Sequence, residues 1–170
     1  MEFWDIYDAN KERTGRTMKR NDWILQDGEY HLTVLGVVKR TDGKFLITKR
    51  VMTKAWAPGC WEVSGGAAQA GEDSKDAVRR EVLEETGLKV EKTTYLFTLP
   101  NIYVYSGFPV HTLDMFFLCR VKDTSHIAAM DDAADAFFVP LMEIHPEDFG
   151  LDSIRKGLDM FIHSNSPSYS

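Results

Sequence analysis

Between positions 66 and 88 the chain carries glutamate, arginine and glycine residues at offsets that could do chemistry together. In a helix, Glu81, Glu84 and Glu85 would lie at positions i, i+3 and i+4, so their carboxylates would cover an arc of about 100°. Three like charges on one face of a helix repel one another and lower its stability. Divalent Mg²⁺ or Mn²⁺ prefers carboxylate oxygens and would remove that repulsion, so the spacing predicts a metal site.

The sequence also predicts where this helix begins and ends. Asp73 or Ser74 is suited to cap its N-terminus, and Asp76 adds negative charge to the first turn, where the helix dipole favours it. Residues 75–86 contain no glycine or proline, and Gly87 supplies a left-handed C-terminal stop. We therefore expect a helix over 75–86 that carries all three carboxylates.

Arg80 and Glu72 are the other two residues of the stretch whose charges could act together. They are too far apart in sequence for a pair on neighbouring turns of one helix. We expect Glu72 in the loop before the helix, with its carboxylate folded back on to the Arg80 guanidinium. Such a bidentate pair would fix the loop and hold the carboxylates of the helix in place. The alternative, a solvated glutamate-rich face, gives no role to Glu72 or to the glycines.

The complete pattern resembles the Nudix box, in which glycine, glutamate, arginine and aliphatic residues recur at fixed offsets. Every specified position is matched here, by Gly66, Glu72, Arg80, Glu81, Val82, Glu84, Glu85, Gly87 and Leu88. The resemblance implies a hydrolase of phosphoanhydrides, in which the Gly66 carbonyl and the three helical glutamates hold one to three Mg²⁺ or Mn²⁺ ions. Glu84 or Glu85 is the candidate general base, with Asp114 in reserve.

Segments outside the box resemble the isopentenyl-diphosphate-isomerase-like branch of the same superfamily. The matching segments are 4–8, 14–15, 31–32, 48–50 and 54–61. The resemblance implies that Arg50 and Lys54 bind a diphosphate opposite the metals. It also raises an alternative function, an isomerase that moves a double bond by proton transfer from a cysteine. Gly66 stands where that cysteine is expected, and Cys60 precedes Trp61, so we favour hydrolysis.

Two further alternatives stay open. Arg50 and Lys54 are also typical of ordinary surface cations. A third functional class is a non-catalytic, nucleotide-sensing protein with the same fold, which the complete box disfavours because no glutamate has been lost. We expect the substrate to be a nucleoside-diphosphate-linked or related diphosphate compound, and the sequence does not determine which one.

The composition predicts a single globular domain over residues 1–170. Hydrophobic residues make up 44% of the chain, which excludes a disordered protein. Twenty basic and 26 acidic side chains give a net charge of −6, which disfavours a nucleic-acid polymer or a membrane as partner. We expect a cytoplasmic protein, because no signal peptide is visible and the two cysteines suggest no disulfide framework. A small-molecule diphosphate is the expected partner, and monomer and homodimer both stay open.

Patterns of apolar residues predict the elements that must position the box. We expect strands over 31–39, 45–50, 61–64, 95–99, 111–121 and 136–139. A turn at 41–43 would join the first two, and a loop would cover 101–109. Apolar spacing along 151–162 predicts an amphipathic helix, followed by a frayed tail at 164–170. The order of elements predicts an α/β fold with a mixed sheet between helices, in agreement with the α/β/α sandwich and loop-helix-loop motif that the Nudix resemblance implies.

Overall fold

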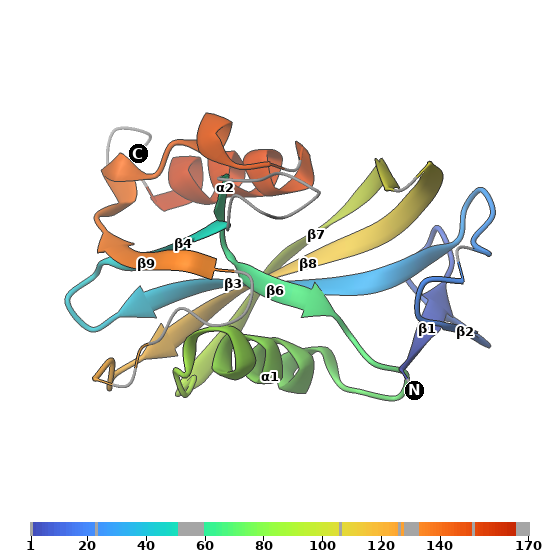
Figure 1. Ribbon diagram of the computed structural model, residues 1–170, viewed down its shortest axis with the longest axis horizontal. Coiled ribbons are helices and arrows are strands. Elements are labelled where there is room, and N and C mark those ends of the chain that lie inside the picture. The colour runs from blue at the N-terminus through green and yellow to red at the C-terminus, as the bar shows by residue number, and fades with distance from the viewer. Residues whose placement is uncertain are drawn as a thin grey trace.

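The computed structural model describes residues 2–22, 24–50, 60–105, 107–125, 127, 133–150 and 152–165. Its strands are β1 (Phe3–Tyr7), β2 (Arg13–Lys19), β3 (Tyr30–Arg40), β4 (Phe45–Arg50), β5 (Trp61–Glu62), β6 (Ser64–Ala67), β7 (Lys92–Tyr105), β8 (Phe108–Val121) and β9 (Ala133–Val139). Its helices are α1 (Ser74–Thr86) and α2 (Asp152–Asn165), with 3₁₀ turns at Leu141–Glu143 and Pro146–Asp148. The sheet lies between α1 and α2, as Figure 1 shows, and this is the predicted α/β sandwich.

The sheet is built around β3. On one edge β3 pairs in parallel with β8, from His31 opposite Thr112 onward. On its other edge it has three antiparallel partners in succession, β1 near its start, β6 in the middle and β4 near its end. β7 pairs with β8, and β9 pairs with β4, both antiparallel. The sheet is therefore mixed, and β6 lies beside the middle of its central strand.

Each face of the sheet packs against one helix. The core on the α1 side contains Val34, Val38, Ala77, Val78 and Val82. The core on the α2 side contains Leu35, Val37, Ile154, Leu158 and Phe161. Side chains alternate between the two faces along a strand, so β3 is apolar on both sides because both are covered by a helix. Through their pairing with β3, the residues of the neighbouring strands can be assigned to the α1 face or to the α2 face in the same way.

Several of the predicted strand boundaries are wrong, most clearly at the turn between β7 and β8 and around Val63. The predicted loop over 101–109 is instead part of the long β7–β8 hairpin, which turns at Gly107 with φ of 82°. Pro100 is tolerated inside β7 because this strand pairs only with β8 among the described strands, and prolines are confined to such edges. The strand predicted over 61–64 is interrupted at Val63, and Gly65 and Gly66 lie inside β6 rather than after a strand.

The two ends of the chain also differ from the prediction. β1 and β2 were not predicted. Along β2 only Met18 is buried, so no alternating pattern marks that strand, whereas β1 is a short strand of five residues in which Trp4 and Ile6 are buried. The C-terminal helix extends to Asn165, beyond the predicted end at 162. Ser164 and Asn165 donate side-chain hydrogen bonds to the Met160 and Phe161 carbonyls, and these bonds extend the last turn into the predicted tail. The rest of that tail, 166–170, lies outside the described residues.

Both cysteines carry free thiols, Cys119 in the core and Cys60 half-buried. Neither α1 nor α2 combines the length and the apolar run that crossing a bilayer requires, and they are the α-helices of the described part of the chain.

Candidate active site

The ends of α1 are fixed by its own sequence. The Asp73 carboxylate accepts a hydrogen bond from the Lys75 backbone N–H, which caps the N-terminus. At the other end Gly87 adopts a left-handed conformation with φ of 74°, and its N–H donates to the Leu83 carbonyl. The predicted helix and both predicted caps are confirmed. The caps fix the first and last residues of α1.

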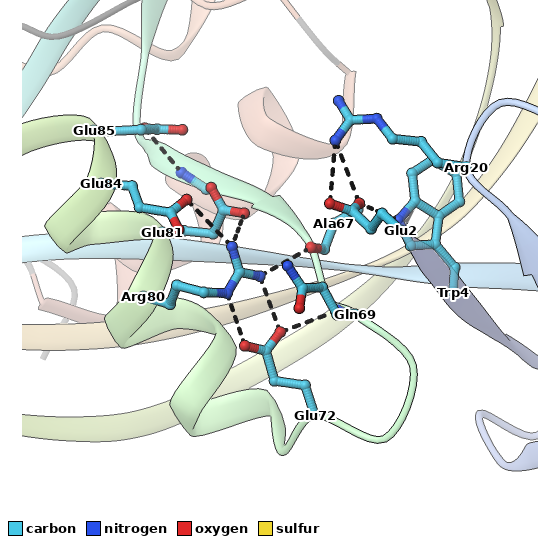
Figure 2. Close-up of polar contacts among 11 residues, drawn as sticks. Glu2, Trp4, Arg20, Ala67, Gln69, Glu72, Arg80, Glu81, Glu84 and Glu85 are labelled. Carbon is cyan, nitrogen blue, oxygen red and sulfur yellow. Dashed lines mark hydrogen bonds and ion pairs between the residues drawn. The ribbon is translucent and has the colours of Figure 1, made fainter.

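Arg80 lies at the centre of a network of ion pairs on that face. Its Nε and Nη2 donate to the two carboxylate oxygens of Glu72, at 2.8 and 2.9 Å, in a bidentate contact. Its Nη1 donates to Glu81 at 2.9 Å and to Glu84 at 3.3 Å. Figure 2 shows the guanidinium between Glu72 on one side and the two helical glutamates on the other. The structure thus forms the pair that the spacing predicts, with Glu72 in the loop before α1.

The same guanidinium also ties α1 to the sheet. Arg80 Nη2 donates to the carbonyl of Ala67, the last residue of β6, at 3.3 Å. The Glu72 carboxylate accepts a further hydrogen bond from the Gln69 backbone N–H at 3.0 Å, inside the connecting loop. The hydrogen bonds from Arg80 hold the pKa of Glu72 below its usual range. Loop, helix and strand are therefore joined through one side chain.

Glu81 is the more deeply buried of the two helical glutamates that Arg80 holds, with 14% of its side chain exposed against 58% for Glu84. Burial raises the pKa of Glu81, and the positive charge of Arg80 opposes that rise. A Cβ atom at Gly66 would lie 2.6 Å from the carboxylate of Glu81. The glycine therefore leaves the space in which this carboxylate lies.

The third glutamate of the cluster, Glu85, lies against the neighbouring glycine. The Gly65 backbone N–H donates to Glu85 Oε2 at 3.4 Å. Gly66 pairs with Val34 and Gly65 with Leu35, so the two glycines face opposite sides of the sheet. A Cβ atom at Gly65 would lie 2.3 Å from the Val34 carbonyl oxygen, on the backbone of β3. Gly66 leaves room for the Glu81 carboxylate, and Gly65 allows β6 to lie close to β3.

The structure does not gather the predicted metal ligands around one point. Among the described residues, no three side chains of His, Cys, Asp or Glu converge closely enough to hold an ion. The carboxylates of Glu81 and Glu84 are turned to Arg80 instead. The donor set still suits a hard divalent cation, because carboxylates from successive turns of one helix lie beside a glycine that leaves them room.

The two predicted diphosphate-binding cations cannot be placed in this site. Lys54 lies outside the described residues, and of Arg50 only the backbone is described, as the last residue of β4. The roles of Arg50 and Lys54 in diphosphate binding therefore stay predictions. Asp114, the reserve base, pairs with Thr33, which in turn pairs with Ala67, so it lies on the α2 face of the sheet rather than on the α1 face with Gly66.

Glu2 is a charged neighbour of the site that the sequence analysis missed. Its carboxylate accepts hydrogen bonds from the Trp4 indole at 2.7 Å and from Arg20 at 3.3 Å, as Figure 2 shows. Its negative charge adds to the burial that raises the pKa of Glu81. No motif could have identified it, because only the fold brings the start of the chain beside α1.

Buried polar residues line the opposite face of the sheet. Strand register aligns His31 of β3, Thr112 of β8 and Asn101 of β7 in one row, and Asp114 lies in the next. Both ring nitrogens of His31 and Nδ2 of Asn101 lack a hydrogen-bond partner among the described residues. His31 stacks on Trp4 with ring centroids 4.1 Å apart, and burial lowers its pKa to about 4. Ser153 of α2 donates to Asp114, whose pKa is raised by burial.

The chain is similar to known proteins in family, sequence and structure. The NUDIX domain family model matches residues 29–158. An uncharacterised Nudix hydrolase from Listeria monocytogenes serovar 1/2a is 33% identical over 152 residues, which cover 85% of this chain and 83% of that protein. A crystal structure from Deinococcus radiodurans superposes with a TM-score of 0.66 at 17% identity, covering 94% of this chain and 98% of that one.

One similar structure was solved with a nucleotide bound. The NUDIX domain of Shewanella oneidensis NrtR, complexed with ADP ribose, superposes with a TM-score of 0.59 at 18% identity. The match covers 76% of this chain and 87% of that one. At these identities the two structural matches show a shared fold, while the family match and the Listeria relative bear on ancestry.

Proposed function

The chain belongs to the NUDIX family and is a hydrolase, and we propose that it cleaves a phosphoanhydride bond with the help of Mg²⁺ or Mn²⁺. The proposed substrate is a nucleoside-diphosphate-linked or related diphosphate compound. One observation carries the proposal: a single guanidinium holds Glu72, Glu81 and Glu84 beside a glycine that leaves room for a carboxylate. The ADP ribose bound to the NrtR domain supports the substrate class.

We assign the metal site to the Gly66 carbonyl and to Glu81, Glu84 and Glu85, for one to three ions. When bound, the cations would neutralise phosphate oxygens and lower the pKa of an attacking water. Arg80 holds two of these carboxylates on the β6 side of α1, and Glu72 in turn fixes the guanidinium. In this proposal Arg80 and Glu72 act by positioning, because their charged atoms are engaged with protein groups.

We assign the general base to Glu84 or Glu85. With 58% of its side chain exposed, Glu84 can be reached by a water molecule. Glu85 accepts a hydrogen bond from the Gly65 N–H, which orients its carboxylate. Either carboxylate could accept the proton that the water loses as it attacks phosphorus. Arg50 and Lys54 would neutralise phosphate oxygens on the other side of the substrate.

The isomerase alternative gains no support from the site. That reaction needs an acid side chain where this chain has Gly66. A Cβ atom at this position would lie 2.6 Å from the Glu81 carboxylate, so a larger side chain there would have to displace that carboxylate. We therefore propose hydrolysis alone, in a reducing cytoplasm that suits the two free thiols.

A substrate panel tests the proposal. It would contain ADP ribose, nucleoside diphosphate sugars, and isopentenyl and dimethylallyl diphosphate, each with Mg²⁺, with Mn²⁺ or with a chelator. We expect metal-dependent release of phosphate-containing products from at least one nucleotide, and an unchanged ratio of the two isoprenoid isomers. Interconversion of those isomers that is lost in Cys60→Ala would overturn the proposal in favour of the isomerase.

A further inference from the structure

A pocket of about 650 Å³ lies where β3 turns into β4, at the end of the sheet drawn on the left in Figure 1. We call it the basic pocket, because five of its lining side chains are cationic, Lys39, Arg40, Lys92, Arg120 and Lys122. Two carboxylates, Asp42 and Glu91, also line it. Five positive charges less two negative ones leave a surplus of three, in a chain whose net charge is −6.

Three of the cations form one row across the sheet. Arg120 of β8 pairs directly with Lys39 of β3 on one side and with Lys92 of β7 on the other. Directly paired side chains share a face, with Cβ atoms about 5 Å apart, and like charges in this position are destabilising. Within the described part of the chain, none of the three forms an ion pair with a carboxylate, although Lys39 lies 5.7 Å from the centre of the Phe45 ring.

The nearest carboxylate of the turn is already engaged. Asp42 accepts two hydrogen bonds from the Arg40 guanidinium, at 3.0 and 2.7 Å, and one from the Lys44 backbone N–H. The same guanidinium lies 4.3 Å from the centre of the Phe138 ring. Asp42 therefore neutralises Arg40 and fixes the turn. Its negative charge is not available to neutralise the row of three cations.

The basic pocket is separate from the carboxylates of α1. Gly66 pairs with Val34, and Lys39 lies five residues further along β3. At about 3.3 Å per residue, the two positions are roughly 16 Å apart along the strand. A ligand in the pocket therefore approaches the row of cations rather than the Arg80 network.

We propose that the basic pocket binds a small polyvalent anion of the polyphosphate class. A chain of phosphates presents several negative charges at spacings that neighbouring lysine and arginine side chains can match. Its binding would offset the repulsion within the row. The concave shape and the net charge of −6 favour a small anion over a nucleic-acid polymer.

Titration of the full chain with inorganic tripolyphosphate tests the proposal. The protein is first stripped of divalent metal on a chelating resin, so that the carboxylates of α1 repel the probe, and the heat of binding is measured at low salt. We expect Lys92→Ala and Arg120→Ala each to weaken binding about fivefold, and the double variant at least tenfold. Arg120→Lys, which keeps the charge, should stay within about twofold. Lys156→Ala removes one exposed charge from α2, outside the pocket, and should leave the affinity unchanged.

Backbone amide chemical shifts locate the site in the same titration. We expect the largest changes at 41–43, 91–92 and 120–122. Equal affinity of Arg120→Ala and Lys156→Ala, or shifts centred elsewhere, would overturn the proposal. Binding of single-stranded RNA without binding of tripolyphosphate would overturn it too, in favour of a polymer. Because hydrolysis is not measured, none of these outcomes bears on the proposed activity of α1.

Discussion

The two faces of the sheet beside β6 treat their polar groups differently. On the α1 face, Arg80 donates to three glutamates and to a backbone carbonyl. On the α2 face, polar atoms of His31 and Asn101 are buried without a hydrogen-bond partner among the described residues. The first face consists of charges that orient one another, and the second holds buried polar groups, among them His31 and Asn101, that are kept from water.

This difference between the two faces predicts how substitutions on each of them will act. A network in which one cation holds several carboxylates keeps them oriented, as catalysis requires. An unpartnered histidine in a buried row is held neutral, since charging it there is costly. Substitutions on the α1 face should therefore change activity more than folding, and substitutions on the α2 face should change stability.

The largest effect is expected for the carboxylates themselves. Glu84→Gln and Glu85→Gln should each lower kcat by at least about a hundredfold, as expected when a metal ligand or general base is lost. The fold should survive, because one negative charge leaves a crowded face. Glu147→Gln, at an exposed position in a 3₁₀ turn, is the control and should retain full activity. Near-normal metal-dependent rates in both site variants would refute the assignment.

Removal of Glu72 should have the next largest effect. Glu72→Ala leaves the Arg80 guanidinium without its bidentate partner, so the carboxylates it orients should become mobile. We expect the affinity for Mn²⁺ to fall roughly tenfold to a hundredfold, as is typical when a group supporting the metal ligands is lost. Calorimetric titration with Mn²⁺ measures it. An unmoved Arg80 and full metal occupancy in a crystal structure of the variant would argue against the role.

Substitution of the two neighbouring glycines should lower activity at one position and stability at the other. Gly66→Ala would push against the end of the flexible Glu81 side chain, so we expect about a tenfold loss of kcat with little change in Tm. Gly65→Ala would meet the backbone of Val34, so we expect a loss of about 1–3 kcal/mol in the free energy of unfolding. Thermal melts and initial rates of both variants measure the contrast. If both lost stability equally, the two faces would not differ as described.

The smallest effect concerns pH. Burial lowers the pKa of His31 to about 4 from 6.5, so the unfolded chain takes up this proton first as the pH falls. The stability from a neutral His31 is thus complete above pH 6.5 and is lost progressively toward pH 4, by about 1.4 kcal/mol at pH 5.5. His31→Phe keeps a ring against Trp4 and should abolish this part of the pH dependence. Denaturant melts at pH 5.5 and 8 test it, with the exposed His145→Gln as control.

The sequence predicted those parts of the site that depend on local spacing. The helix, its caps and the Glu72–Arg80 pair follow from offsets within one short segment, where helix geometry alone brings side chains together. The hairpin between β3 and β4 was predictable for the same reason, since Asp42 and Gly43 form its turn.

The sequence could not predict what depends on pairing between distant strands. The row of His31, Thr112 and Asn101 exists because β3 pairs with β8 and β8 with β7, a register that no local pattern specifies. The segment 101–109 was predicted to be a loop, whereas the edge position of β7 lets this strand continue past Pro100. Glu2 joins the site only through the tertiary fold.

The central claim is that the carboxylates of α1 direct water to phosphorus with the help of a divalent cation. The most direct test uses the nucleotide of the panel that is hydrolysed fastest. It is hydrolysed in ¹⁸O-labelled water, and the products are analysed by mass spectrometry. The account predicts one ¹⁸O atom in a phosphate group of the product, formed only with Mg²⁺ or Mn²⁺ and at least about a hundredfold more slowly in Glu84→Gln. Label outside the phosphate groups, or a rate indifferent both to chelator and to Glu84→Gln, would contradict it.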